Sequence, residues 1–391
     1  MCVMSDWRDP WLRARERVAD QYGRHVGEPV DSLSTPALVV DVDAMRRNIG
    51  VMFDALAGQR ARLRPHTKVQ KSPDIALLQV AAGAIGVTVA SVWEAAAMAA
   101  AGIADILIAN QVVPQDKVEA AAALAAHADL TLVVDDERNI EALSAAMTRR
   151  GTQAGALVEL DVGMARCGAR SPAEALALAR LADAAPGLNL KGIQAYEGHC
   201  MLEPDRGTRI RLATEAMDYA ASVQELLQRD GLPAGTLSGG GTGTYDITGA
   251  NPAVTELQAG SYVFMDAFHG GLVPGFEVSL TTLTSVIARH GDTIILDAGR
   301  KSVGIDFVSP PILGHDYVAR YYAEEHALFD VDDRLTAGLG DRLRLVSGYA
   351  PTTVNLHEVI FAARGGRVAG VWPVFPRGPG HFGFPAALGL E

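Results

Sequence analysis

Short apolar segments alternate with amphipathic or alanine-rich segments along the first two thirds of the chain. Each apolar segment is four to eight residues of mostly Val, Ile, Leu and Ala, which is typical of buried strands, and helical periodicity follows it. The first apolar segment, 35–45, passes directly into a helix that runs to about residue 57. The remaining predicted strands lie in residues 63–68, 86–91, 105–113, 129–136, 154–163, 189–198 and 236–246.

This alternation predicts a parallel sheet, because strands that are apolar on both faces need helices to cover both sides. Eight such units in roughly 230 residues favour a closed (β/α)8 TIM-type barrel. An open, doubly wound sheet is the alternative. The turn after the first strand has no GxGxxG sequence, which argues against a dinucleotide-binding sheet.

The pattern changes after about residue 275, where β-branched residues alternate with polar ones and helical periodicity disappears. We expect an antiparallel β-domain here, which includes a strand over residues 354–364. The predicted organisation is an N-terminal helical arm (1–33), a barrel (34–270) and a mainly β C-terminal domain (271–391). Trp7 and Trp11 are available to pack the arm against the rest of the molecule.

Composition narrows the class of protein. The 391 residues are 49% hydrophobic and 20% charged, as in ordinary globular proteins, and the net charge of −12 disfavours nucleic acid or an anionic membrane as a partner. The three cysteines form no CxxC pair, and neither an 18-residue apolar run nor a signal-like N-terminus is visible. We therefore expect a cytoplasmic, soluble protein with a small-molecule partner.

Lys68 is the first candidate for chemistry. It lies at or just beyond the end of a predicted strand, and Ser72 and Pro73 then open a helix as N-cap and first residue. A lysine close to apolar barrel walls can have a lowered pKa and act as an amine nucleophile. A solvated surface lysine is the alternative.

Further candidates follow later strands. Arg166, in DVGMARCG (161–168), can hold a phenolate oxygen through its guanidinium, and Tyr196, in GIQAYEGH (192–199), can stack on a ring. A rim arginine and a core tyrosine are the alternatives. The glycine-rich SGGGTGTYD (238–246) allows backbone N–H groups to converge on an anion, at the place where barrels bind phosphate.

Four segments resemble one known family. RPHTKVQK (64–71), DVGMARCG, GGGTGT (239–244) and ELQAGSYVFMD (256–266) are similar to motifs of the D-threonine aldolase and D-serine dehydratase family, fold-type III pyridoxal-phosphate enzymes related to alanine racemase. The resemblance implies a barrel followed by a β-domain, with pyridoxal 5'-phosphate held by Lys68 as a Schiff base, a homodimer, and an amino-acid substrate. The cofactor contacts that it implies, besides Lys68, are Arg166, Tyr196, Gly240, Gly241, Thr242, Gly243, Thr244, Ser261 and Tyr262.

The chain departs from the family at its metal site. Where the family has His-x-Asp or His-x-Cys, this chain has Tyr349 and Pro351, so we expect no metal there. His357 and Glu358 would not replace the pair, because adjacent residues of a strand face opposite sides. Leu202 stands where the aldolases carry a histidine, and His199 lies nearer the strand. Tyr349 and His199 therefore become candidate acid–base groups.

These residues predict a pyridoxal-phosphate enzyme that acts at Cα of an amino acid. A metal-independent, D-threonine aldolase-like carbon–carbon lyase on a β-hydroxy amino acid is the favoured reaction. A metal-free racemase or epimerase and a D-serine dehydratase-like ammonia-lyase are the enzymatic alternatives. A pyridoxal-phosphate carrier without catalysis is the alternative from another class, and the additional β-domain argues against it.

Overall fold

The first of two sheets is an eight-stranded parallel barrel. The computed structural model describes residues 6–390, and in it the strands follow the order β2-β9-β8-β7-β6-β5-β4-β3. A parallel bridge between His66 and Thr88 joins the two ends of this order, so the ring closes as predicted. The strands are β2 (Arg62–Leu63), β3 (Val87–Val89), β4 (Asp105–Gln111), β5 (Asp129–Val134), β6 (Ala154–Glu159), β7 (Leu188–Ala195), β8 (Thr236–Gly239) and β9 (Glu256–Leu257).

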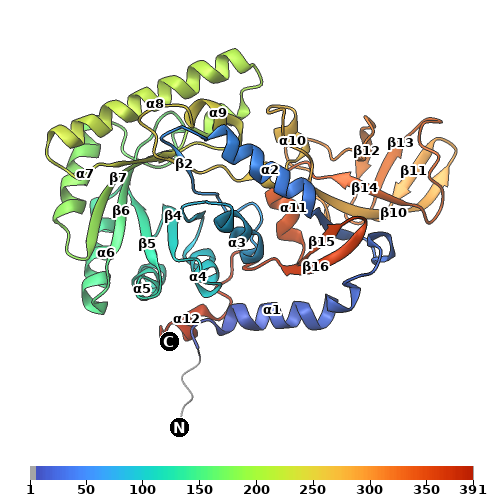
Figure 1. Cartoon of the computed structure of the whole chain (residues 1–391), viewed down its shortest axis with the longest axis horizontal. Coiled ribbons are helices and arrows are strands. Elements are labelled where there is room, and N and C mark those ends of the chain that lie inside the picture. Colours follow the sequence, from blue (N-terminus) through green and yellow to red (C-terminus); the bar gives the residue numbers. More distant parts are fainter. Residues whose placement is uncertain (1–5, 391) are drawn as a thin grey trace, which may run out of the picture.

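Helices cover the outside of the barrel, and α5 to α8 line its outer wall in Figure 1. Their ends follow local sequence signals. Asp136 and Ser171 cap α6 and α7 through their side chains, and Gly151 ends α6 in the left-handed conformation. The helices are α2 (Val42–Ala55), α3 (Pro73–Ala81), α4 (Val92–Ala100), α5 (Gln115–Leu124), α6 (Glu137–Arg150), α7 (Pro172–Ala184), α8 (Arg206–Arg229) and α9 (Tyr245–Thr248).

One predicted barrel strand is wrong. The segment expected as the first strand forms β1 (Ala37–Asp41), which pairs with β10 and β15 of the second sheet and not with the barrel. The place in the barrel is taken by β9, which has only two residues and follows the glycine-rich turn. An apolar strand buried on both faces fits either sheet, so the pattern of β1 does not distinguish between them. The division at about residue 270 remains a prediction.

The second sheet is antiparallel apart from the β1–β15 pair, and it lies beside the barrel in Figure 1. Its path is β12-β13-β11-β10-β1-β15-β16, with β14 paired to β10. The strands are β10 (Leu280–His290), β11 (Thr293–Leu296), β12 (Ala319–Tyr322), β13 (Ala327–Asp330), β14 (Arg342–Val346), β15 (Val359–Arg364) and β16 (Arg367–Pro373). Short helices accompany it: α10 (Ala267–Gly270), α11 (Ala350–Leu356) and α12 (Phe384–Ala387).

The predicted strand over 354–364 is also partly wrong, because its first residues belong to helix α11. Pro351 stands in the first turn of this helix, where its missing N–H is tolerated. Although His357 and Glu358 do not lie within a strand, their side chains have different hydrogen-bond partners. The Nε2 atom of His357 lies 2.7 Å from the carbonyl of Ser302, and Glu358 accepts a hydrogen bond from Tyr22.

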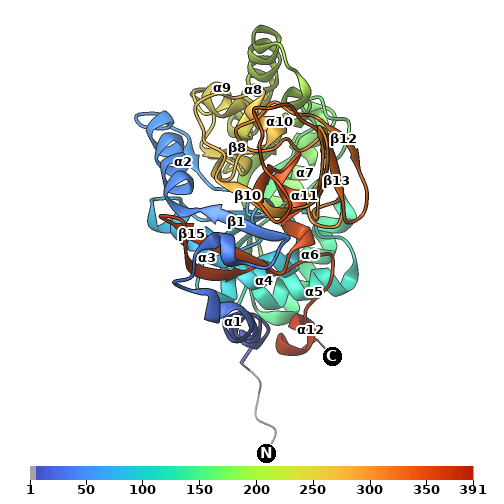
Figure 2. The same ribbon diagram turned by 90° about the vertical axis from the view of Figure 1, so that its right-hand side faces the viewer.

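The N-terminal arm contains one long helix, α1 (Asp9–Tyr22), and the one-turn helices Gly23–His25 and Val30–Ser32. Residues 1–5 of the predicted arm lie outside the described range. Trp7 stacks on His127, and the buried Trp11 packs against Phe375, so both tryptophans hold α1 to the rest of the chain. Figures 1 and 2 show α1 and α12 on the same side of the molecule. Over the described range, every helix is too short or too polar to cross a membrane.

A buried ion pair at the amino ends of the barrel strands gives a test of this fold. Arg64, after β2, contacts Glu256 of β9 at 2.9 Å and Asp105 of β4 at 2.7 Å, and its side chain is 7% exposed. Arg64→Ala leaves both carboxylates without their partner, so we expect the free energy of unfolding to fall by about 3 kcal/mol or more. Denaturant unfolding measures this.

The matched control is Arg62→Ala, which removes an exposed arginine two residues earlier. We expect the control to change the free energy of unfolding by no more than about 0.5 kcal/mol. Equal stability of the two variants would contradict the buried ion pairs of Arg64 described here.

Candidate active site

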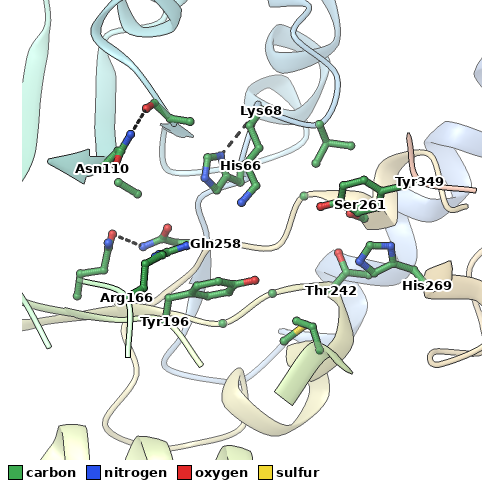
Figure 3. Close-up of a pocket in the computed structure, with 18 of the residues that line it drawn as sticks. His66, Lys68, Asn110, Arg166, Tyr196, Thr242, Gln258, Ser261, His269 and Tyr349 are labelled. Atoms are coloured by element: carbon green, nitrogen blue, oxygen red, sulfur yellow. Dashed lines mark hydrogen bonds between the residues drawn. The ribbon is translucent and has the colours of Figure 1, made fainter. Parts of the chain in front are cut away.

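A cavity opens at the carboxyl ends of the barrel strands, where TIM-type barrels carry their chemistry. Its volume of about 240 Å³ is just below the usual range of small-molecule sites, which begins near ~300 Å³. Four of the predicted side chains line it: Lys68, Arg166, Tyr196 and Tyr349. The predicted loop residues that line it are Gly240, Gly241, Thr242 and Ser261. Figure 3 shows the amine of Lys68 pointing into this space.

Lys68 has the electrostatic environment of a reactive amine. Burial and the nearby Arg166 lower its pKa, as the sequence predicted, so more of the amine is uncharged near neutral pH. The neighbouring Lys71 differs, because its Nζ atom forms a salt bridge of 2.5 Å with the buried carboxylate of Glu94. Of these two lysines, only Lys68 is available as a nucleophile.

Tyr196 lies close to two basic side chains. The Nζ atom of Lys68 lies 5.8 Å from the centroid of its ring, and the guanidinium carbon of Arg166 lies 5.7 Å from it. Both distances are within the range in which an aromatic face attracts a cation. No hydrogen bond or salt bridge to any residue between 6 and 390 engages the Arg166 guanidinium. Its donors are therefore free for an anionic ligand.

The glycine-rich turn is held in place by a buried carboxylate. Glu197 is fully buried and accepts hydrogen bonds from the Gly240 N–H (3.0 Å), the Thr244 hydroxyl (2.6 Å) and the Thr248 hydroxyl. Two features of the backbone require glycine at position 240. Its φ is +77°, and a Cβ there would lie 2.4 Å from Leu257. This anchoring fixes the backbone of the turn against the cavity.

Thr242 links the glycine-rich turn to the Ser261 turn. Its Oγ1 atom accepts the Tyr262 N–H at 3.0 Å, so its own hydroxyl proton remains available to a ligand. Residues 242–244 and 261–263 each form a single 3₁₀ turn. The first N–H groups of such turns have no partner inside the turn. The two turns therefore bring several donors to one side of the cavity.

The structure does not bring four predicted residues to the cavity. The His199 ring lies against Gly163 and Cys200, and its Nδ1 atom is buried without a partner among the described atoms. Thr244 donates to Glu197, and Gly243 lies against Met201. The hydroxyl of Tyr262 is fully buried and accepts a hydrogen bond from Gln79. These four residues do not contact the cavity, and the roles predicted for them remain predictions.

The sequence reasoning missed several polar residues that do line the cavity. Gln258 follows β9 and donates to Gln194 at 2.8 Å, and Asn110 is fixed by the Ala90 carbonyl at 3.0 Å. His66 lies beside Lys68, and burial with that neighbouring charge lowers its pKa well below the ordinary value. Amide side chains carry no motif of their own. The sequence signal that could have found these residues is their position, directly after a barrel strand or at its end.

His269 is the other residue that was missed, and it lies next to Tyr349. The two rings stack with centroids 6.0 Å apart and an interplanar angle of 17°, and both line the cavity. In Figure 3 they lie together, across the cavity from Asn110 and Arg166. Burial, with Asp266 and Asp306 nearby, raises the pKa of Tyr349, so its phenol stays neutral. Within residues 6–390, no group of three or more His, Cys, Asp or Glu is arranged to hold a metal ion.

Comparisons with known families agree with the arrangement of the chain. The family model described as alanine racemase, N-terminal domain, matches residues 40–267, which is more than half of the chain. A model for a serine dehydratase domain matches residues 279–363.

Three individual proteins are similar over most of the chain. A D-threonine aldolase from Arthrobacter sp. is 39% identical over 360 residues, which cover 90% of this chain and 95% of that protein. A 3-hydroxy-D-aspartate aldolase from Paracoccus denitrificans (strain Pd 1222) is 37% identical over 372 residues, which cover 91% of this chain and 95% of that protein. A D-threo-3-hydroxyaspartate dehydratase from Delftia sp. (strain HT23) is 34% identical over 284 residues, which cover 70% of this chain and 74% of that protein.

The fold is similar to that of a solved relative. The crystal structure of D-threonine aldolase from Filomicrobium marinum superimposes with a TM-score of 0.88 at 35% identity, and covers 90% of this chain and 98% of that one. The predicted barrel with a following β-region is thereby confirmed.

Glu159 under the cavity gives a pH-dependent test. Burial raises its pKa to about 8, Asp135 and Asp161 add to this, and the Gln194 amide and Arg166 oppose it. The folded protein binds this proton more tightly than the unfolded chain does. Its contribution to stability is therefore complete below about pH 4.5 and lost as the pH rises through about 8. Between pH 6 and pH 9 we expect the free energy of unfolding to fall by about 3 kcal/mol from this group.

Glu159→Gln replaces the protonated acid by an amide of the same shape. In this variant the fall in the free energy of unfolding between pH 6 and pH 9 that comes from Glu159 should vanish. The free energy of unfolding at pH 6 should stay close to that of the wild type. Denaturant unfolding at both pH values measures these free energies. An unchanged slope would show that Glu159 does not bind a proton in this range.

Proposed function

This chain belongs to the alanine racemase N-terminal domain family, and from that premise we propose that it is a pyridoxal-phosphate-dependent lyase. The substrate class is a β-hydroxy D-amino acid, and the reaction is aldol-type cleavage between Cα and Cβ. The observation that carries the proposal is the pair of Lys68 and Arg166 on the ring of Tyr196, opposite the two 3₁₀ turns. The names of the similar proteins support the substrate class.

The cavity fits the cofactor. Pyridoxal phosphate carries an aldehyde, a ring hydroxyl and a phosphate, and these need an amine, a cation and a set of hydrogen-bond donors. Lys68 supplies the amine, and the unengaged guanidinium of Arg166 supplies the cation. The two turns and the free hydroxyl proton of Thr242 supply the donors. When bound, the cofactor stabilises the electron pair that is left at Cα when a bond there breaks.

The side chains of the protein have separable tasks. Lys68 binds the cofactor through its partly uncharged amine and takes or returns a proton at Cα. Arg166 keeps a phenolate oxygen ionised by donating to it. Gln194 and Gln258, which hydrogen-bond to each other, form a fixed polar floor. Glu197 keeps the glycine-rich turn in place without touching the cavity.

Aldol-type cleavage is favoured over the enzymatic alternatives by the wall made of Tyr349 and His269, which places two acid–base groups in the cavity in addition to Lys68. Cleavage needs such a group at the β-hydroxyl, whereas racemisation uses its second acid–base group at Cα. We propose that the reaction does not use the family's metal-ligand pair, because its places hold Tyr349 and Pro351. Dehydration of a β-hydroxy amino acid is the second candidate, favoured by the similarity to a dehydratase.

We further propose a cytoplasmic homodimer. Several apolar side chains are exposed on the β-region, and Phe307, 63% exposed, packs against Tyr349 at the cavity. A second subunit would cover this surface. The absence of a CxxC pair in the sequence fits a reducing compartment.

Product analysis tests the proposed reaction. With D-threonine or 3-hydroxy-D-aspartate, we expect the cofactor-loaded protein to release an aldehyde and glycine, at a rate unchanged by a chelator. Lys68→Ala should lower this rate by ~10³-fold or more, because the amine acts in every turnover. Lys191→Ala, which changes a lysine distant from the cavity, should leave it unchanged.

Two results would contradict the proposal. Deuterium exchange at Cα without cleavage would move the assignment to a racemase or epimerase. Release of ammonia with a keto acid would move it to a dehydratase.

A further inference from the structure

A buried carboxylate pairs with His269, an imidazole in one wall of the cavity, and this pair is not explained by cofactor binding. Asp266 is fully buried and accepts three hydrogen bonds: from the His269 backbone N–H (2.8 Å), from the His269 ring at Nδ1 (2.8 Å) and from the Ala350 N–H (2.9 Å). The last bond ties α10 to the start of α11, which carries Tyr349. The pair is thus fixed to both elements that form this wall.

Asp266 also decides which nitrogen of His269 carries the proton. A carboxylate accepts hydrogen bonds, so the Nδ1 atom facing it is the N–H, and in the neutral ring the lone pair then lies on Nε2. Phe268 and Tyr349 fix the plane of the ring, with centroids 5.1 Å and 6.0 Å from it. His269 is thus placed like a catalytic base whose ring is oriented by a neighbouring group, here Asp266.

The backbone before the pair is strained. Met265 has a φ of +48°, in the left-handed region that costs a non-glycine residue about 1 kcal/mol or more. Such strain persists when the surrounding structure imposes it, and it is concentrated at functional sites. Here it brings Asp266 into position as the N-cap of α10, from where it reaches both His269 and Ala350.

Tyr349 and His269 differ in what they can do with a proton. The raised pKa of Tyr349 keeps it neutral, so its hydroxyl donates a hydrogen bond and is a poor base. His66, the other imidazole in the cavity, lies beside Lys68 and not on this wall. The acceptor on this wall is therefore the Nε2 atom of His269.

We infer that His269, oriented by Asp266, is the general base for the β-hydroxyl of the substrate, and that Tyr349 donates a hydrogen bond to the same oxygen. This inference rests on the proposed function. The hydroxyl proton moves to Nε2, and the O–H electron pair becomes the second C–O bond of the aldehyde. The Cα–Cβ bond breaks, its electron pair stays at Cα, and a proton returns there to give glycine. No oxidant or reductant is required.

The first test separates cleavage from cofactor binding and from chemistry at Cα. In the cofactor-loaded His269→Gln variant, we expect kcat for D-threonine cleavage to fall by ~10²-fold or more, since a general base contributes about that much. Visible cofactor absorbance, and deuterium exchange at Cα of D-2-aminobutyrate, which lacks the β-hydroxyl, should stay within about twofold of the wild type. His290→Gln, the same change at an exposed strand end, is the matched control and should change none of these quantities.

Each contrary result has a distinct meaning. Unchanged cleavage in His269→Gln would overturn the inference and leave the proposed function intact. Loss of cofactor absorbance, or an equal loss of exchange and cleavage, would assign His269 to cofactor binding or to the structure and would also overturn it. Failure of the wild type to cleave any β-hydroxy amino acid would overturn the proposed function together with this inference.

A second readout needs no turnover. Nitrogen-15 NMR of histidine-labelled, cofactor-free protein, with the signal assigned by its absence in His269→Gln, should show His269 protonated at Nδ1 and unprotonated at Nε2. Asp266→Asn should reduce this preference, and thermal unfolding would confirm that the variant is folded. Protonation at Nε2 in the wild type would contradict the inference.

Discussion

The site depends on keeping two basic side chains close together, the partly buried Lys68 and the exposed Arg166. Lys68 and Arg166 approach the ring of Tyr196 from the ends of different barrel strands, at 5.8 Å and 5.7 Å. Burial and the neighbouring guanidinium of Arg166 both disfavour protonation of the lysine. One group therefore becomes a nucleophile and the other a fixed cation. The remaining structure serves to hold these two groups in this relation to the 3₁₀ turns.

Buried polar groups around the cavity provide that rigidity. Glu197 binds the glycine-rich turn through three donors, and Asp266 binds α10 and the start of α11 through three others. Breaking such a network leaves buried groups unsatisfied, so both carboxylates resist movement of the segments that they join. Neither touches the cavity directly. The two 3₁₀ turns and the Tyr349–His269 wall thus have separate anchors, which suits a site that holds a cofactor on one side and a substrate hydroxyl on another.

Much of this arrangement could be predicted from the sequence, and the failures have physical reasons. The βα alternation predicted the barrel, and the places of Lys68, Arg166 and Gly240 after strands predicted their convergence. The pattern could not assign β1 to the second sheet, because strand pairing is a long-range choice, nor reveal β9, which is two residues long. The last three residues of α11 (354–356) were taken for the start of a strand, because they run into the apolar, β-branched segment that forms β15. Glu197 and Asp266 went unnoticed, since their importance comes from partners distant in the chain.

The most direct test of the central claim is to locate the lysine that binds pyridoxal phosphate. Borohydride reduction fixes the covalent link, and peptide mass spectrometry then identifies the modified residue. Lys68 and Lys71 lie three residues apart, and they differ in that Lys68 has a lowered pKa and Lys71 is paired with Glu94. The account predicts the label on Lys68 with none on Lys71. A label on Lys71, or none on either residue, would contradict it.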